Sequence, residues 1–149
     1  MVLITRSTAI PREPAQVWTA LAEFDAISLW APNVDHSCLM TEQAEGVGTV
    51  RRIQTGRMTV RETVIAYEPG RVLGYEISGL PKAIDSVTNT WTLEPDGAAT
   101  RVTLTTEIVP GPRPPHRAVA RAVGKALGDA SDQMLEGLAE HLAKENVDG

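Results

Sequence analysis

The residues of greatest chemical interest are polar side chains that the sequence places among apolar ones. Within Met58–Ala66, apolar and polar residues alternate, and Glu62 falls in the apolar set. Successive side chains of a strand point to opposite faces, so this parity predicts that Glu62 faces the interior. The same reasoning along the other alternating segments predicts an inward polar set of Arg6, His36, Arg52, Glu62, Tyr75, Asn89 and Thr106.

This polar set allows two interpretations. A buried polar group without a hydrogen bond costs about 1–3 kcal/mol, so each of these side chains needs a partner. They could pair with one another, for example Glu62 with Arg6 or Arg52, or with water at a polar end of a pocket. Alternatively, they orient the hydroxyl or carbonyl groups of a ligand, because small-molecule sites are mostly apolar with a few convergent polar groups.

Glu62 is the best candidate for a catalytic residue. Buried without a counter-ion, it could donate or accept a proton, as a cyclase or dehydratase requires. Paired with an arginine it would form a structural ion pair, which is the interpretation we favour. His36 and Cys38 lie about 6.7 Å apart along one strand, which suits a core cysteine beside a pocket histidine better than a catalytic pair. The spacing of His36, His116 and His141 is not that of a metal site, and we expect no metal and no cofactor.

The elements that must position these residues follow from periodicity and turn signals. Alternating, β-branched segments separated by Gly, Pro and Asp predict a meander of antiparallel strands. The first strand is followed by two short helices, one beginning at Pro14 and one capped by Asp25. The predicted strands are Val2–Ile10, Val34–Thr41, Thr49–Gln54, Met58–Tyr67, Val72–Ser78, Ser86–Glu94 and Thr100–Val109, and the second short helix is Ala26–Trp30.

The last element, His116–Lys144, is predicted to be one long amphipathic helix. Its apolar residues recur every three or four positions, which is the spacing of one helical face. We expect this helix to lie across the concave face of the sheet. Its inward residues would include Leu127, Ala130, Met134 and Leu138, opposite Glu62, Tyr75, Asn89 and the inward-facing Trp91.

Three glycines, Gly124, Gly128 and Gly137, interrupt the apolar face of this helix. Each should weaken an isolated helix by about 1 kcal/mol relative to alanine, so something must compensate. The compensation is either close packing on the sheet or room for a guest molecule. Gly128 and Ala130 are interpreted as positions where a bulky side chain would fill a cavity.

Composition restricts the class of protein. The chain has 149 residues with 42% hydrophobic and 22% charged residues, as expected of one globular domain spanning residues 1–149. A net charge of -5 argues against a nucleic-acid partner. No stretch approaches the roughly 20 apolar residues of a membrane span, and the single cysteine, Cys38, suits a reducing compartment. We therefore expect a cytoplasmic protein, monomeric or homodimeric.

A series of short motifs resembles the SRPBCC (START/Bet v 1-like) superfamily, and within it the polyketide cyclase/dehydrase-type proteins. No single motif is specific, but their order and spacing span nearly the whole chain. The motifs are Pro14-Ala15-Gln16-Val17-Trp18, Phe24-Asp25, Trp30-Ala31-Pro32, Gly46-Val47-Gly48-Thr49-Val50-Arg51-Arg52, Glu62, Tyr67-Glu68-Pro69-Gly70-Arg71, Leu73-Gly74-Tyr75 and Thr90-Trp91-Thr92-Leu93-Glu94-Pro95.

The resemblance implies an α+β helix-grip fold in which a seven-stranded antiparallel sheet encloses a cavity with the C-terminal helix. It also implies that Trp30 lies at one rim of the cavity mouth. Members of the family bind hydrophobic small molecules, and a minority are cyclases or dehydratases. We therefore expect a protein that binds a lipid- or polyketide-like ligand. The alternatives are a polyketide cyclase/dehydratase-type enzyme and a partner-protein interaction module with a vestigial cavity.

Overall fold

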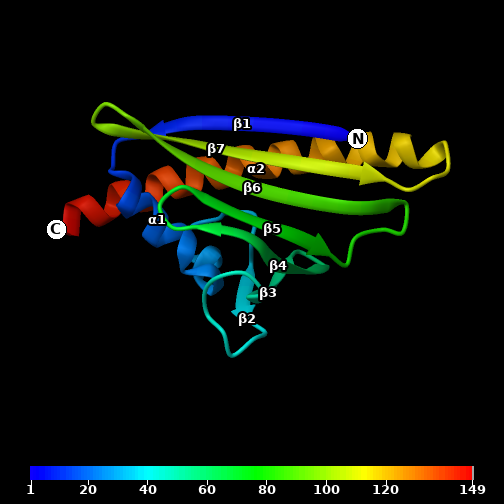
Figure 1. Ribbon diagram of the computed structural model, residues 1–149, viewed down its shortest axis with the longest axis horizontal. Coiled ribbons are helices and arrows are strands. Elements are labelled where there is room, and N and C mark those ends of the chain that lie inside the picture. The colour runs from blue at the N-terminus through cyan, green and yellow to red at the C-terminus, as the bar shows by residue number, and fades with distance from the viewer. Residues whose placement is uncertain (149) are drawn as a thin grey trace.

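The computed structural model describes residues 1–148, and its framework is one curved antiparallel sheet. The sheet has seven strands in the order β1-β7-β6-β5-β4-β3-β2, so the first strand pairs with the last (Figure 1). The strands are β1 (Val2–Ile10), β2 (His36–Leu39), β3 (Val50–Thr55), β4 (Met58–Glu68), β5 (Val72–Ser78), β6 (Ile84–Asp96) and β7 (Ala99–Pro110). The predicted strand meander is confirmed, although β2 is shorter than expected.

Two short helices follow β1. Helix α1 (Pro14–Ala22) has proline at its first turn, and Gln16 Oε1 accepts a hydrogen bond from the Glu13 backbone N–H at 3.1 Å. The second helix, η1 (Phe24–Leu29), is a 3-10 helix that begins two residues before the predicted start. Its short turn brings the Trp30–Val34 segment beneath the last helix.

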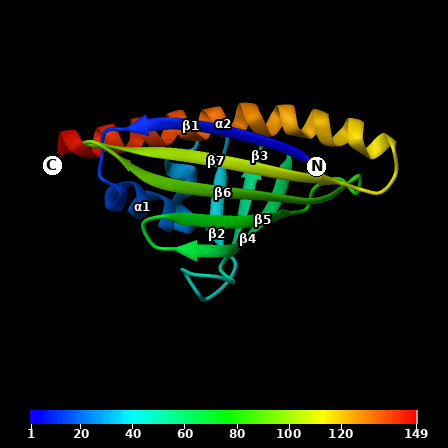
Figure 2. The ribbon, with the colours of Figure 1, turned by 45° about the horizontal axis from the view of Figure 1, so that its top comes forward.

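Helix α2 (Pro115–Asp148) runs along the concave side of the sheet, closest to β1 and β7 (Figure 2). In its second half, Met134, Leu138 and Leu142 are buried, as the periodicity predicts. In its first half, Val119, Val123, Leu127 and Ala130 are only partly buried. The helix therefore closes the core tightly at one end and leaves apolar surface accessible at the other. Within residues 1–148, no helix is both long and apolar enough to cross a membrane.

The three glycines of α2 mark close packing rather than space for a guest. A Cβ at Gly124 would lie 3.1 Å from Val2 Cγ1, and one at Gly128 would lie 2.9 Å from an Arg6 nitrogen. A Cβ at Gly137 would overlap the carbonyl oxygen of Trp30. The absence of side chains thus lets α2 approach β1 and the Trp30 segment. The interpretation of Gly128 as a cavity position is wrong, because Arg6 and Ile4 occupy the space beside it.

Candidate ligand-binding site

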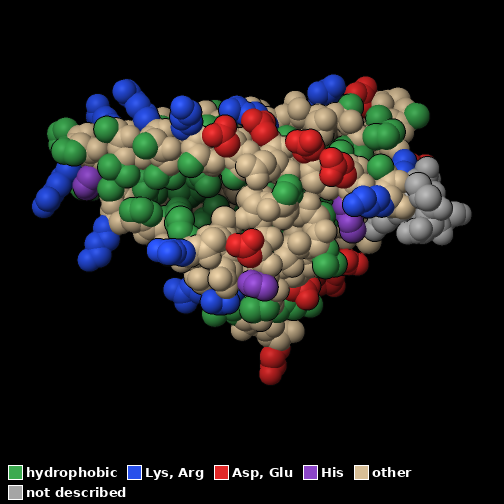
Figure 3. Space-filling model, turned by 180° about the vertical axis from the view of Figure 1, so that it is seen from behind, with side chains coloured by type: hydrophobic (Ala, Val, Ile, Leu, Met, Phe, Trp, Pro, Cys, Tyr) green, Lys and Arg blue, Asp and Glu red, His purple; other side chains and the backbone are tan. Residues whose placement is uncertain are grey.

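A cavity of about 240 Å³ lies between the sheet, η1 and α2. Figure 3 shows it from behind as a hollow surrounded by hydrophobic side chains, on the side of the molecule where α2 lies. Most of its lining is aliphatic. The lining residues are Ile27, Asn33, Val34, Ile53, Thr55, Met58, Val60, Glu62, Ile77, Leu80, Asn89, Ala126, Leu127, Ala130 and Met134.

Glu62 is the charged residue in this lining, and its partner is Arg51. Nε and Nη2 of Arg51 both lie 2.7 Å from Glu62 Oε1. The side chains are only 2% and 9% exposed, so this is a buried ion pair. Strands β3 and β4 position the pair directly, because Arg51 and Glu62 are opposite each other in the register. The prediction that Glu62 forms a structural ion pair is confirmed, but its partner is Arg51 rather than Arg6 or Arg52.

The rest of the Arg51 guanidinium is also occupied. Nη1 donates to the Phe24 carbonyl oxygen at 2.8 Å. The Phe24 ring centroid lies 3.7 Å from the guanidinium carbon and the Tyr75 ring centroid 4.7 Å, which are cation–π distances. Arg51 is therefore enclosed behind the cavity wall, whereas Glu62 lines the cavity itself.

Asn89 belongs to a second buried polar cluster. Its Oδ1 accepts from Thr106 Oγ1 at 2.6 Å, and its Nδ2 lies 3.4 Å from the Tyr75 hydroxyl. Trp91 Nε1 donates to the same hydroxyl at 3.2 Å. Burial, and then the nearby Glu62 carboxylate, raise the pKa of Tyr75 above its ordinary value. Tyr75 therefore remains a neutral hydroxyl across the physiological pH range.

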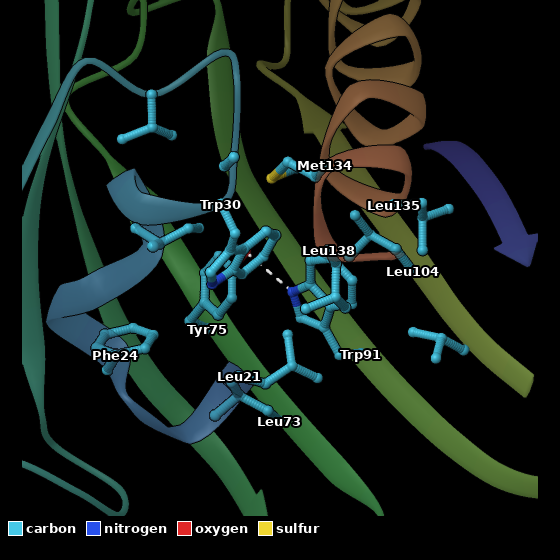
Figure 4. Close-up of a cluster of buried hydrophobic side chains, with 14 of the residues drawn as sticks. Leu21, Phe24, Trp30, Leu73, Tyr75, Trp91, Leu104, Met134, Leu135 and Leu138 are labelled. Atoms are coloured by element: carbon cyan, nitrogen blue, oxygen red, sulfur yellow. Dashed lines mark hydrogen bonds between the residues drawn. The ribbon is translucent and has the colours of Figure 1, made fainter. Parts of the chain in front are cut away.

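A layer of large side chains closes the inner end of the site. Figure 4 shows Trp30, Tyr75, Trp91, Met134 and Leu138 packed between η1, the sheet and α2, with the Trp91–Tyr75 hydrogen bond drawn as a dashed line. The Trp30 and Trp91 rings meet edge to face at 5.9 Å. Of these five residues, Met134 lines the cavity.

The residues predicted from the sequence therefore fall into three groups. Glu62, Asn89, Leu127, Ala130 and Met134 line the cavity. Trp30, Tyr75, Trp91 and Leu138 are buried in the packed layer beside it. The expectation that Trp30 lies at the rim of the cavity mouth is therefore wrong, because its ring packs against Trp91 in the core. Arg6, His36 and Arg52 lie elsewhere.

The predictions for His36 and Arg52 are wrong, because the strand parity in β2 and β3 is the reverse of that assumed. His36, Cys38 and Arg52 are exposed, whereas Arg51 and Ile53 are buried. Cys38 is thus an exposed free thiol rather than a core residue. The same reversal applies to Met40, which is half exposed at 50%.

Arg6 faces α2 as predicted, but it lies on the edge strand β1. Its Nε lies 3.2 Å from Asp132 Oδ1, and both side chains are about half exposed. Gly128 packs against its guanidinium. Arg6 therefore joins the sheet edge to α2 outside the cavity and is not a ligand-binding residue in this arrangement.

Several residues of the site were missed by the sequence reasoning. Three lining residues lie where strand parity gives no information. Asn33 lies in a turn, Thr55 ends β3, and Ala126 lies on an exposed part of α2. Arg51 could have been predicted from the sequence. Ile53 is the bulkiest apolar residue of β3 and should face the core, and Arg51, two residues before it, lies on the same face of the strand. No three His, Cys, Asp or Glu side chains among residues 1–148 are grouped as a metal site would require.

The fold agrees with a comparison against known protein families. The family described as polyketide cyclase/dehydrase and lipid transport matches residues 1–143, and the protein belongs to it. This confirms the resemblance drawn from the motifs, and with it the helix-grip fold. No curated protein matches the sequence.

Solved structures show the same fold. A solution NMR structure of a protein from Thermobifida fusca superposes with a TM-score of 0.81 at 24% identity, over 97% of this chain and 95% of that one. The crystal structure of the ZhuI aromatase/cyclase from Streptomyces sp. R1128 gives a TM-score of 0.75 at 17% identity, over 96% and 94%. A protein from Thermus thermophilus gives 0.75 at 18% identity, over 97% and 99%. At these identities the likeness concerns the fold alone.

Proposed function

We propose that this protein binds a hydrophobic small molecule in the cavity between the sheet and α2. The observation that carries the proposal is an accessible cavity of about 240 Å³ whose wall is mainly aliphatic, from Ile27 and Val60 to Leu127. Monomeric proteins rarely leave such apolar surface open to water without a use for it. Family membership supports the same role.

The volume of the cavity restricts the size of the ligand. A dry cavity of about 150 Å³ accepts benzene, and drug-sized ligands occupy about 300–1,000 Å³. A cavity between these limits suits a ligand of about one or two rings, or a short branched chain.

Binding is favoured over cyclase or dehydratase chemistry because Glu62 and Asn89, which line the cavity, already have partners. Glu62 forms an ion pair with Arg51. Asn89 is hydrogen-bonded to Thr106 and to Tyr75. Neither cluster presents a nucleophile with an adjacent base, as covalent catalysis requires. An open cavity also disfavours the interaction module, for which a collapsed cavity is expected.

The test is mass spectrometry of small molecules retained by the purified protein, with a matched pair of variants. Ala130→Trp places a large ring in the cavity wall, whereas Ala122→Trp places it on the exposed face of the same helix. We expect the wild type and Ala122→Trp to retain the same apolar compound, and Ala130→Trp to lose it while keeping its circular dichroism spectrum. Retention by folded Ala130→Trp, or no uptake of any apolar probe by the wild type, would contradict the proposal.

A further inference from the structure

The one charged group among the described residues that line the cavity is a hydrogen-bond acceptor. Glu62 is a carboxylate held in an ion pair, and a carboxylate can only accept hydrogen bonds. The contacts from Arg51 converge on Oε1, which leaves Oε2 with capacity for another donor. Asn33 also lines the cavity, but its Oδ1 is buried and not open to a ligand.

The amide of Asn89 adds no free hydrogen-bonding group to the cavity wall, because both of its ends are bonded within the protein. The 2.6 Å distance from Thr106 Oγ1 suits an O–H···O bond better than an N–H···O bond, so the amide oxygen faces Thr106. Its nitrogen is directed to the Tyr75 hydroxyl. The strong polar group that remains available to a ligand is therefore the Glu62 carboxylate, an anionic acceptor.

The cation that balances Glu62 is out of reach of a ligand. Each guanidinium nitrogen of Arg51 faces Glu62 or the Phe24 carbonyl, and the rings of Phe24 and Tyr75 pack against the guanidinium. Arg51 is not part of the cavity lining. An anionic ligand entering the cavity would meet the carboxylate and lose its own hydration without gaining a cation.

From these contacts we infer that the cavity selects ligands with a hydrogen-bond donor, such as a hydroxyl or an N–H group, on an apolar body. It rejects carboxylic acids, including fatty acids. This inference rests on the proposed function, since it names the chemical class of the molecule that the cavity binds. Glu62 is the specificity-determining residue, because its carboxylate accepts a hydrogen bond from a donor on the ligand and repels an anionic ligand.

The test compares three two-ring probes of similar size, namely 2-naphthol, naphthalene and 2-naphthoate, by the change in their fluorescence on binding at pH 7. We expect 2-naphthol to bind at least tenfold more tightly than naphthalene, and 2-naphthoate to bind more weakly than either. If naphthalene binds as tightly as 2-naphthol, or 2-naphthoate binds best, the inference is overturned and the cavity remains a general apolar site. If no probe binds, the proposed function and the inference both fail.

A variant pair assigns the selectivity to Glu62. Glu62→Gln leaves Arg51 buried without its partner and risks misfolding, so the double variant Arg51→Met with Glu62→Met is measured beside it. Replacing both members of a buried ion pair by apolar residues is often tolerated. We expect the tenfold preference for 2-naphthol to disappear in the folded double variant. A preference that persists there would overturn the role of Glu62.

Discussion

Arg51 stabilises the buried polar cluster through three kinds of contact. It forms an ion pair with Glu62, donates to a backbone carbonyl and packs against two aromatic rings. Such a residue is difficult to replace, because the groups around it are buried and arranged for a cation. The free energy of unfolding should therefore depend strongly on this one side chain.

Arg51→Met should lower the free energy of unfolding by about 3–5 kcal/mol, because it leaves the Glu62 carboxylate buried without a counter-ion. The double variant with Glu62→Met should recover most of that loss. Urea unfolding of both variants at pH 7 measures the two values. If the single and double variants are equally destabilised, the lost contacts to Phe24 and Tyr75 matter more than the unpaired charge.

Tyr75 gives a specific pH dependence. Burial raises its pKa, so the folded protein holds the phenol proton more firmly than the unfolded chain, where the pKa is about 10. The contribution of this raised pKa to the free energy of unfolding is present in full below about pH 10. It is lost as the pH rises through the pKa of the folded protein. We expect the wild type to lose more stability than Tyr75→Phe between pH 8 and pH 11 in urea unfolding. Equal losses would show that the other titrating groups, which both proteins share, account for the alkaline decline.

Helix α2 illustrates how packing can override helix propensity. At Gly137, alanine would favour the isolated helix by about 1 kcal/mol, but its Cβ would meet the Trp30 carbonyl oxygen. At Gly124, the neighbouring atoms are side-chain methyl groups of Val2, Ile4 and Ile108 rather than backbone atoms. The same substitution should thus have different effects at two positions of one helix.

Gly137→Ala should destabilise the protein by about 1–3 kcal/mol, the usual range for overpacking, because backbone atoms must move to accommodate the new methyl group. Gly124→Ala should be closer to neutral, since side-chain ends can shift. Thermal and urea unfolding of the two variants give the comparison. Equal effects would mean that the contact between α2 and the Trp30 segment is looser than described.

The elements also show where sequence reasoning succeeds. In β4 to β7, β-branched and apolar residues alternate with threonine and charged residues, so parity correctly orients Tyr75, Asn89 and Trp91. In β2 and β3, the apolar residues Cys38 and Val50 suggest the wrong face. The buried Arg51 has the residue type expected at a surface position, so its burial is not predicted. Parity also gives no information on Asn33, which lies in a turn. The core of the fold could therefore be predicted, whereas the ion pair at the site required the cross-strand register.

At the scale of the whole molecule, ligand binding and stability should be linked. A ligand that binds only the folded state stabilises it by about 2.7 kcal/mol when its free concentration is a hundred times Kd. For a chain of this length that corresponds to a rise in Tm of about 5–10 °C. The retained compound should raise the Tm of the wild type by this amount and leave that of Ala130→Trp unchanged, as measured by calorimetry. A similar rise in the variant would place the ligand outside the cavity.

The pairing of β1 with β7 has a consequence for synthesis of the protein. Ile10 pairs with Thr100, so the first strand leaves the ribosome about 90 residues before its partner. At roughly 5–20 residues per second, this segment waits for several seconds with its backbone hydrogen-bonding groups unpaired. An unpaired apolar strand is prone to associate with other chains. The nascent chain should therefore depend on the cellular machinery that shields N-terminal segments, until β7 emerges and α2 can close over the completed sheet.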